Sequence, residues 1–170
     1  KNFTLKFKDG TQHILNENGL TFSQGDTFDT INGTNFNDVI YANDGNDTVN
    51  ALAGNDTVYG GKGNDIIDAG NGNDTLVGGE GNDTLAGGVG DDTYIYNLGD
   101  GFDTISDTDG TDKIVLGTGI TADMLSFSRE GNDLRIIINN DKLQGFLLKN
   151  QFAAGTSKIE SIEFADESLN

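Results

Sequence analysis

Eight aspartates recur at a strict nine-residue spacing in the first part of this 170-residue chain. Two positions after each of them stands an apolar residue, and most are preceded by glycine and asparagine. Carboxylate oxygens are the ligands that hard cations prefer, and a fixed period indicates one small unit stacked on itself many times. The spacing therefore predicts that the fold and its ligand are linked. The eight residues are Asp29, Asp38, Asp47, Asp56, Asp65, Asp74, Asp83 and Asp92.

The period continues after a short interruption. The two residues Tyr96-Asn97 shift the frame, after which Asp103 and Asp112 take the aspartate position, each again followed two residues later by isoleucine. Ten units can therefore be aligned, with the middle ones closest to one another and the ends more divergent. We expect the repeated architecture to end near Val115.

Each unit divides into a six-residue loop and a three-residue strand. Glycines in the loop permit positive φ angles and close approach of backbones. In the strand, alternation turns the middle apolar residue inward and its neighbours outward. Two units per turn would give a coil of 18 residues and two parallel sheets face to face. The sequence thus predicts an all-β fold, a parallel β-roll that has a core only when its units stack.

Alternate aspartates of such a coil line opposite edges, and stacked loops lie about 4.8 Å apart. Unscreened carboxylates at that distance repel, whereas a divalent cation between them would bind both, with loop carbonyls completing six or more oxygen ligands at about 2.3–2.6 Å. Irregular oxygen coordination favours calcium over magnesium. Zinc is implausible because the chain has no cysteine and a single histidine, His13.

Charge excludes several other partners. The net charge is −18, and between residues 24 and 95 Lys62 is the single base. A nucleic-acid surface needs basic groups that displace phosphate counterions, and an acidic block is repelled by anionic membrane. No apolar run approaches the roughly 20 residues of a membrane span, so we expect no membrane insertion by these residues, and the amino terminus has no signal-peptide pattern.

No catalytic motif accompanies the repeat. The serines lack a nucleophile context, and His13 has no second histidine or cysteine to make a catalytic pair. Asp107, Asp109 and Asp112 resemble the start of an EF-hand loop, but the twelfth position is Thr118 instead of glutamate. We therefore expect no enzyme activity from these residues.

Composition divides the chain into three zones. Residues 1–23 are expected to form a hairpin, 24–115 the roll and 116–170 a β-rich cap. Thr121 could begin a helical turn up to Leu125 as its N-terminal cap. Strands of the last zones are expected near Ile114–Leu116, Leu125–Ser128, Leu134–Ile138, Phe146–Leu148 and Ile159–Phe164.

Four consecutive units, GGKGNDIID, AGNGNDTLV, GGEGNDTLA and GGVGDDTYI at 60–95, resemble the nonapeptides of RTX proteins, the haemolysin-type calcium-binding repeats. The segments LGDGFDTISDTDGTDKIVL, LSFSREGNDLRIII and IESIEFAD resemble the part that closes RTX blocks. The resemblance covers about 24–166. It implies a calcium-binding β-roll and export by type I secretion from a Gram-negative bacterium.

The same resemblance implies which atoms hold the ions. Asp29 departs from the pattern in its loop, QGDTFD, so we leave it out of the ligand set, and we keep Asp38 although Phe36 stands where glycine is expected. The implied side-chain ligands are Asp47, Asp56, Asp65, Asp74, Asp83 and Asp92, to which the frame adds Asp38, Asp103 and Asp112. The implied carbonyl ligands include those of Gly60, Lys62, Gly78, Glu80 and Gly87.

Our leading hypothesis is a calcium-responsive folding module of a secreted, extracellular or cell-surface toxin, adhesin or other exoprotein. An alternative is an adhesin module that binds glycan, ice or a host surface. A further one is the non-catalytic end of a secreted protease or lipase. The chain opens at Lys1, so we expect a piece of a longer protein, and the likeness of FTLKFKDGT (3–11) to IEFADES (162–168) indicates neighbouring tandem blocks.

Overall fold

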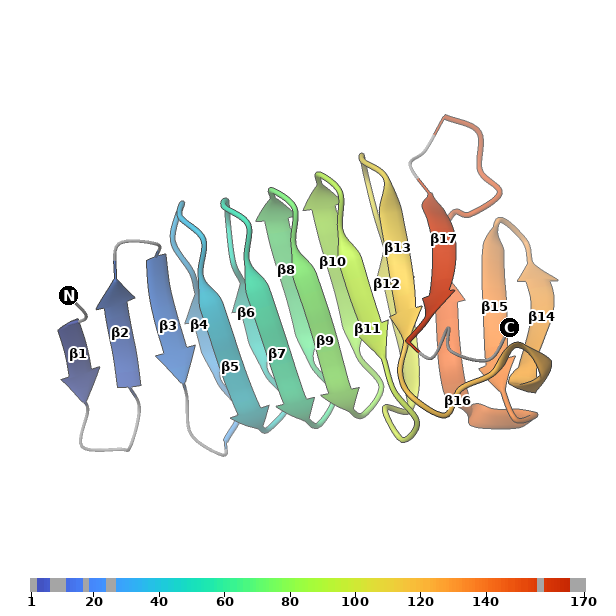
Figure 1. Ribbon diagram of the computed structural model, residues 1–170, viewed down its shortest axis with the longest axis horizontal. Coiled ribbons are helices and arrows are strands. Elements are labelled where there is room, and N and C mark those ends of the chain that lie inside the picture. Colours follow the sequence, from blue (N-terminus) through green and yellow to red (C-terminus); the bar gives the residue numbers. More distant parts are fainter. Residues whose placement is uncertain (1–2, 7–11, 17–18, 24–26, 156–157, 166–170) are drawn as a thin grey trace.

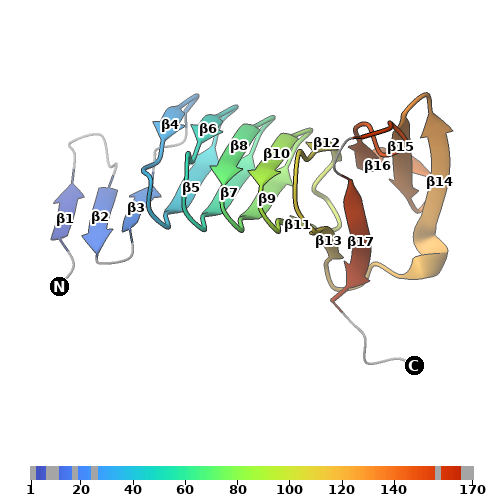
Figure 2. The same cartoon turned by 90° about the horizontal axis from the view of Figure 1, so that it is seen from above.

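The computed structural model describes residues 3–6, 12–16, 19–23, 27–155 and 158–165, and these form two stacked sheets (Figures 1 and 2). Sheet 1 has nine strands in the order β1-β2-β3-β5-β7-β9-β11-β13-β17, and sheet 2 has eight in the order β14-β15-β16-β12-β10-β8-β6-β4. The strands are β1 Phe3–Lys6, β2 Gln12–Asn16, β3 Gly19–Ser23, β4 Thr30–Asn32, β5 Val39–Asp44, β6 Thr48–Asn50, β7 Thr57–Lys62, β8 Ile66–Asn71, β9 Thr75–Glu80, β10 Thr84–Val89, β11 Thr93–Tyr96, β12 Phe102–Ser106, β13 Asp112–Leu116, β14 Leu125–Glu130, β15 Asp133–Ile138, β16 Asp141–Leu148 and β17 Ile159–Phe164.

The predicted parallel β-roll is confirmed. From β3 to β13 successive strands alternate between the sheets, and neighbours within a sheet run parallel, 18 residues apart, as in the pairing of Val58 with Leu76. The separation becomes 20 where Tyr94 pairs with Ile114 and Leu85 with Ile105. The Tyr96-Asn97 insertion is therefore absorbed within one coil, and the frame continues beyond it. We call β4–β13 the roll and residues 117–165 the cap.

The core of the roll is a thin column of small and medium side chains. The apolar residue two positions after each aspartate is at most 2% exposed, from Ile31 to Ile114, as the inward orientation predicts. Alanines at the first loop position, such as Ala51, are also buried. Full burial of an aliphatic side chain contributes about 1.5–3 kcal/mol. With about one such residue in each nine-residue unit, apolar burial gives the roll little stabilisation for the length of chain that it orders.

The division into three-residue strands and six-residue loops is wrong in one respect. Strands such as β7 and β9 are six residues long, because backbone pairing resumes beyond the bend, with Gly61 opposite Gly79 and Lys62 opposite Glu80. Gly61 turns the chain at a φ of 114°, and a Cβ there would lie 1.9 Å from the carbonyl oxygen of Asn43. Glycine thus lets the strand bend while the coils remain in contact.

Both ends of the roll continue into antiparallel strands. The predicted hairpin is confirmed in the pairing of β1 with β2, although its turn, 7–11, lies outside the described residues. The sequence did not indicate β3, which pairs antiparallel with β2 and parallel with β5. At the other end β14, β15 and β16 form an antiparallel meander, β16 joins β12 and β17 joins β13.

The five strands expected from Ile114 onward are confirmed. The helical turn is a single 3-10 turn, η1 Ala122–Met124, and Thr121 makes no side-chain cap, because its hydroxyl pairs with the carboxylate of Asp123. The cap also buries large side chains, among them Ile136 and Phe146, and they join the same core cluster as the roll residues. In the described part of the chain, no helix is long and apolar enough to cross a membrane.

Candidate metal sites on the two edges

The registered aspartates form two ladders, one on each edge of the roll. Within each ladder the backbone N–H of one aspartate donates to Oδ1 of the aspartate one coil later, at 2.7–3.0 Å. One ladder holds Asp38, Asp56, Asp74, Asp92 and Asp112. The other holds Asp29, Asp47, Asp65, Asp83 and Asp103. This is the alternation of edges that the spacing predicts, and it includes both residues beyond the insertion.

The second carboxylate oxygen of most ladder residues has no partner within the protein. These Oδ2 atoms are buried and accept no hydrogen bond. A buried charged oxygen without a partner is costly, and a row of them at successive coils adds mutual repulsion. The unpartnered atoms are Oδ2 of Asp29, Asp47, Asp56, Asp65, Asp74, Asp83, Asp92 and Asp112.

The loops leave room beside these oxygens. A Cβ at Gly60 would stand 2.4 Å from Oδ2 of Asp65 and 2.4 Å from the carbonyl oxygen of Gly78, one coil later. A carboxylate from one loop and a carbonyl from the next therefore converge on the space that a side chain at 60 would fill. Gly78 has the same relation to Oδ2 of Asp83, at 2.3 Å. Oxygen donors alone, from two loops, form the ligand chemistry of a calcium site.

Burial also changes the acidity of the ladder carboxyls. Desolvation is the largest cause, and it raises the pKa of Asp56 to about 7 and that of Asp65 to about 6. The hydrogen bond that each carboxylate accepts from a backbone N–H partly lowers the pKa, and the charges of neighbouring ladder carboxylates raise it again. The pKa of Asp103 rises to about 8 for the same first reason. Without a cation, the folded roll thus favours the protonated form of its own ladder.

Among the ladder residues, Asp38 already uses its second oxygen. The backbone N–H and the hydroxyl of Thr34 both donate to Oδ2 of Asp38, at 2.6 and 2.9 Å. Most other loops have glycine, asparagine or leucine at this position, and only the loop of Asp112 also has a threonine, Thr108. A hydroxyl that serves this carboxylate makes Asp38 a weaker candidate ligand than its partners higher on the ladder.

The implied carbonyl ligands lie at the edges with the ladders, and two of them already accept hydrogen bonds. The carbonyl of Lys62 accepts from the N–H of Gly45, and that of Glu80 accepts from the N–H of Gly63, one coil earlier. A carbonyl oxygen has two lone pairs, so each could also hold an ion. Gly87 lies beside Oδ2 of Asp92, as Gly60 does beside Asp65.

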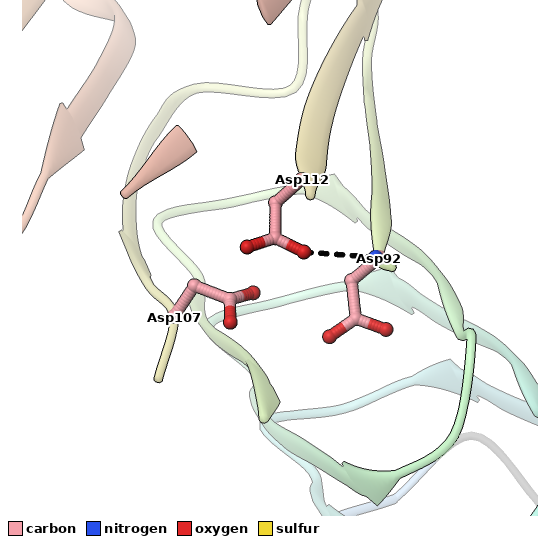
Figure 3. A group of neighbouring side chains, drawn as sticks. All are labelled: Asp92, Asp107 and Asp112. Carbon is pink, nitrogen blue, oxygen red and sulfur yellow. Dashed lines mark hydrogen bonds between the residues drawn. The ribbon is translucent and has the colours of Figure 1, made fainter. Parts of the chain in front are cut away.

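Sequence reasoning missed one acidic ligand candidate, Asp107. Its carboxylate lies with those of Asp92 and Asp112 in a group whose ligand atoms are within 4.8 Å of one another (Figure 3). The hydroxyl of Tyr94 hydrogen-bonds Oδ2 of Asp107, and desolvation, followed by the Asp107 charge, raises the pKa of Asp92 to about 8. The signal was available, because Asp107 occupies the first position of its unit, where Gly87 stands one coil earlier.

A second set of ladders runs beside the first in the opposite sense. The backbone N–H of Asn64 donates to Oδ1 of Asn46, one coil earlier, and the pairs Asn55–Asn37 and Asn82–Asn64 repeat this bond. Where asparagine precedes a ladder aspartate, as at Asn46 and Asn64, it therefore links coils, a role that the sequence pattern did not reveal.

Two family models match this chain. The RTX calcium-binding nonapeptide repeat matches four times, at residues 24–58, 41–76, 59–94 and 68–102, and the haemolysin-type calcium binding protein related domain matches at 133–166. The chain belongs to the RTX family. RTX nonapeptide repeats bind calcium, and the carboxylates of Asp92, Asp107 and Asp112 form a group that could hold a metal ion. No curated protein matches the chain.

The RTX assignment covers both the roll and the end of the cap, and it agrees with the donor chemistry of the edges. The chain therefore carries calcium-binding repeats. An RTX roll is a calcium-binding structural domain and not a catalytic fold, which agrees with the absence of a catalytic motif in the sequence.

Proposed function

We propose that this RTX module is a calcium-dependent folding unit of a secreted protein. The supporting observation is the row of buried Oδ2 atoms without partners. In the proposed ligand set, the ladder aspartates from Asp47 to Asp92, with Asp103, Asp112 and Asp107, supply side-chain oxygens. Loop carbonyls such as those of Gly60, Lys62, Gly78, Glu80 and Gly87 supply the rest. Asp38 contributes least to ion binding, because its Oδ2 already accepts hydrogen bonds from Thr34.

The energetic argument follows from the balance of the roll. Its apolar core is thin, and its edges concentrate buried carboxylates whose pKa values are raised by desolvation. Calcium neutralises those charges and occupies their free lone pairs, so ion-binding free energy becomes folding free energy. Because an inner loop faces one ion above and one below, we expect binding to be cooperative along each edge.

This dependence suits a protein that crosses membranes before it folds. Haemolysin-type repeats are typical of extracellular secreted bacterial proteins. Extracellular calcium modules bind at about 10⁻⁴–10⁻³ M, so the chain would remain unfolded where free calcium is scarce and fold after export. We propose type I secretion from a Gram-negative cell as the route, with a toxin, adhesin or secreted hydrolase as the parent protein.

Far-UV circular dichroism tests the folding role directly. The chain in excess chelator should give the spectrum of an unfolded polypeptide, and millimolar calcium should restore a β spectrum with a sigmoidal dependence on concentration. Magnesium at the same concentration is the control, since its demand for octahedral geometry should leave the chain unfolded. A chelated sample with a complete β spectrum that calcium does not change would refute the proposal.

One surface feature favours an additional binding role. Tyr41 and Tyr59 lie on the outer side of sheet 1 with their rings stacked at 4.9 Å, and both remain more than a third exposed. Exposed aromatic rings on a rigid sheet are common in recognition surfaces, which fits an adhesin that binds a glycan or another host-surface ligand. Screening the calcium-loaded chain and its Tyr41→Ser, Tyr59→Ser variant against glycans would test this. Equal signals from the two proteins would exclude the tyrosines.

A further inference from the structure

The two sheets end unevenly at the amino-terminal end. The coil of β3 and β4 is the first in which both sheets take part, and sheet 1 continues beyond it by two strands, β2 and β1. Sheet 2 has no strand in the described residues to face them. Figure 2 shows this pair extending past β4.

The carboxy-terminal end has the opposite overhang. Beyond the coil of β11 and β12, sheet 1 adds β13 and β17, whereas sheet 2 adds β16, β15 and β14. Counted outward from that coil, β13 stands opposite β16 and β17 opposite β15, so β14 faces no strand of sheet 1 in the described chain. In Figures 1 and 2, β14 is the outermost strand at this end.

The exposed strand carries core-type residues. Phe127 pairs directly with Ile136, which is fully buried, and directly paired residues lie on the same face of an antiparallel sheet. Phe127 is therefore on the core side of sheet 2, yet it is 59% exposed. Its neighbour on that face, Leu125, is only partly buried. This is the composition of an interior face whose covering strand is absent.

The end strands of sheet 1 are similar in sequence. In an alignment of FTLKFKDGT (3–11) with residues 160–168, Leu5 falls on Ile162 and Phe7 on Phe164. The alignment also agrees with the strand register, because Ile162 pairs with the core residue Ile114, and Leu5 is in register with the core residue Ile40 through β2 and β3. The two strands concerned, β1 and β17, are the terminal strands of sheet 1.

We propose that the two ends are halves of one joint between tandem RTX blocks, in which β17 of one block serves as β1 of the next. The strands then match one for one. The β2 of the following block then lies opposite β14. Its β3 and β4 form the next coil, with β4 paired to β14. The partner is a homologous block, and the result is one continuous two-sheet solenoid.

Strand directions agree with this joint. β17 runs parallel to β13, as β1 runs parallel to β3 through two antiparallel steps. In sheet 2, β14 runs parallel to β12, again through two antiparallel steps from β16. A β4 added to β14 would therefore be parallel to it, which is the arrangement of every neighbouring pair in the roll.

The test is a chain that shares the strand, with residues 1–164 followed directly by residues 8–170. Two complete copies joined by a long Gly/Ser linker form the first control. The second control omits Lys8 at the junction, which shifts the register by one residue and reverses the faces. In calcium, X-ray scattering should give the strand-sharing chain a rigid rod profile with nearly twice the maximum dimension of a single copy. The linker pair should behave as two jointed bodies.

Phe127 supplies a readout that is specific to the joint. Phe127→Thr in the first block should change a single copy little, since the ring is exposed there. In the strand-sharing chain, burying a phenylalanine contributes enough that its loss should reduce hydrogen-exchange protection at the joint by about tenfold or more. Ile66→Thr is the matched control, because Ile66 is 54% exposed in mid-roll and stands between Thr48 and Thr84.

Three results would overturn the proposal. They are jointed-body scattering from the strand-sharing chain, failure of that chain to fold while the linker pair folds, and equal effects of Phe127→Thr in single and tandem chains. Circular dichroism of a single copy, with and without calcium, reports calcium-dependent folding in the absence of any joint. A failed joint is therefore distinguishable from a failure of calcium-dependent folding.

Discussion

The aspartates of the roll and Asp133 of the cap obtain their countercharges in opposite ways. Asp133 accepts from the ammonium of Lys149 and the N–H of Asn150, and the lysine bond lowers its pKa. Asp65 forms no ion pair within the described residues, and desolvation raises its pKa to about 6. The cap carries its own cation, whereas the roll must take cations from solution.

Core composition shows the same contrast. Phe146, Ile136 and Leu148 of the cap belong to one core cluster, while a mid-roll strand such as β7 buries one aliphatic side chain and a glycine. A folded roll therefore depends on its edges and a folded cap on its interior. The predictions below test that difference, in order of decreasing effect.

Removing calcium should separate the two regions most clearly. With chelator, we expect amide protection in β5–β12 to fall by several orders of magnitude, because the buried carboxylates lose their countercharge. β15 and β16 should keep more protection, since their core contains no unpaired carboxylate. Hydrogen exchange with mass spectrometry would measure both. Uniform loss in roll and cap at one calcium concentration would show that the two regions fold as one unit.

A glycine comparison is expected to give the next largest effect. Gly63 has a φ of 120°, and a Cβ there would lie 1.7 Å from the carbonyl oxygen of Gly45 in the neighbouring coil. We expect Gly63→Ala to destabilise the calcium-loaded chain by at least about 3 kcal/mol, because steric overlap adds to backbone strain.

Gly131 in the cap is the matched control, with a φ of 66° and nothing within 4 Å of its added Cβ. Gly131→Ala should cost only about 1 kcal/mol, the strain of a positive φ alone. Urea unfolding in calcium would measure both variants. Similar losses would mean that coil contact does not limit the roll.

A mid-ladder aspartate should separate its two bonding roles. Asp65→Asn keeps an oxygen that can accept from the N–H of Asp47 but removes the charge, so the calcium midpoint should rise by about tenfold. Asp65→Ala should also lose this buried hydrogen bond, worth about 0.5–1.5 kcal/mol. Asp68→Ala, at an exposed position of β8, the strand that follows Asp65, is the control. Calcium titrations that rank Asp68→Ala with the other two would contradict the ladder assignment.

Calcium binding should depend on pH in the direction set by the raised pKa values. The pKa values of Asp56 and Asp83 are about 7 in the folded chain, against an ordinary value of 3.8. Between these values the metal-free folded state holds more protons than the unfolded chain, so its stability falls as pH rises.

Calcium requires the deprotonated carboxylates. The calcium midpoint should therefore fall several-fold between about pH 5.5 and about pH 8, with net proton release on binding. Calorimetry in buffers of different ionisation enthalpy would measure that release. A midpoint independent of pH would contradict buried, raised-pKa ligands.

The smallest effect is expected at the ion pair between Asp133 and Lys149 of the cap. Asp133→Asn should lower the thermal stability of the cap slightly and leave the calcium midpoint unchanged, because an exposed ion pair is weak and screened by salt. The small contribution of the charged pair should fade only below the ordinary pKa of aspartate, since its folded pKa is lowered. A shift in the calcium midpoint would show that the cap charge couples to the roll.

Much of the molecule follows from its period. The nine-residue spacing predicts the inward apolar column, the two sheets and the assignment of aspartates to edges, because a stacked coil repeats one local geometry. It also carries the frame past Tyr96-Asn97 to Asp112. It could not predict the length of the strands, since bends at residues such as Gly61 preserve pairing that is visible only between coils.

The sequence by itself determined the coil, its ion and the edge on which each repeated aspartate lies, since each depends on residues within one unit and its neighbour. Only the tertiary structure decided the roles of the two carboxylate oxygens, with Oδ1 accepting from the aspartate N–H one coil earlier and Oδ2, in most ladder residues, buried without a partner. It also placed Asp107 beside Asp92 and left Phe127 exposed on an interior face. These features depend on contacts between segments 15 or more residues apart and on which strand ends each sheet, which no local pattern specifies.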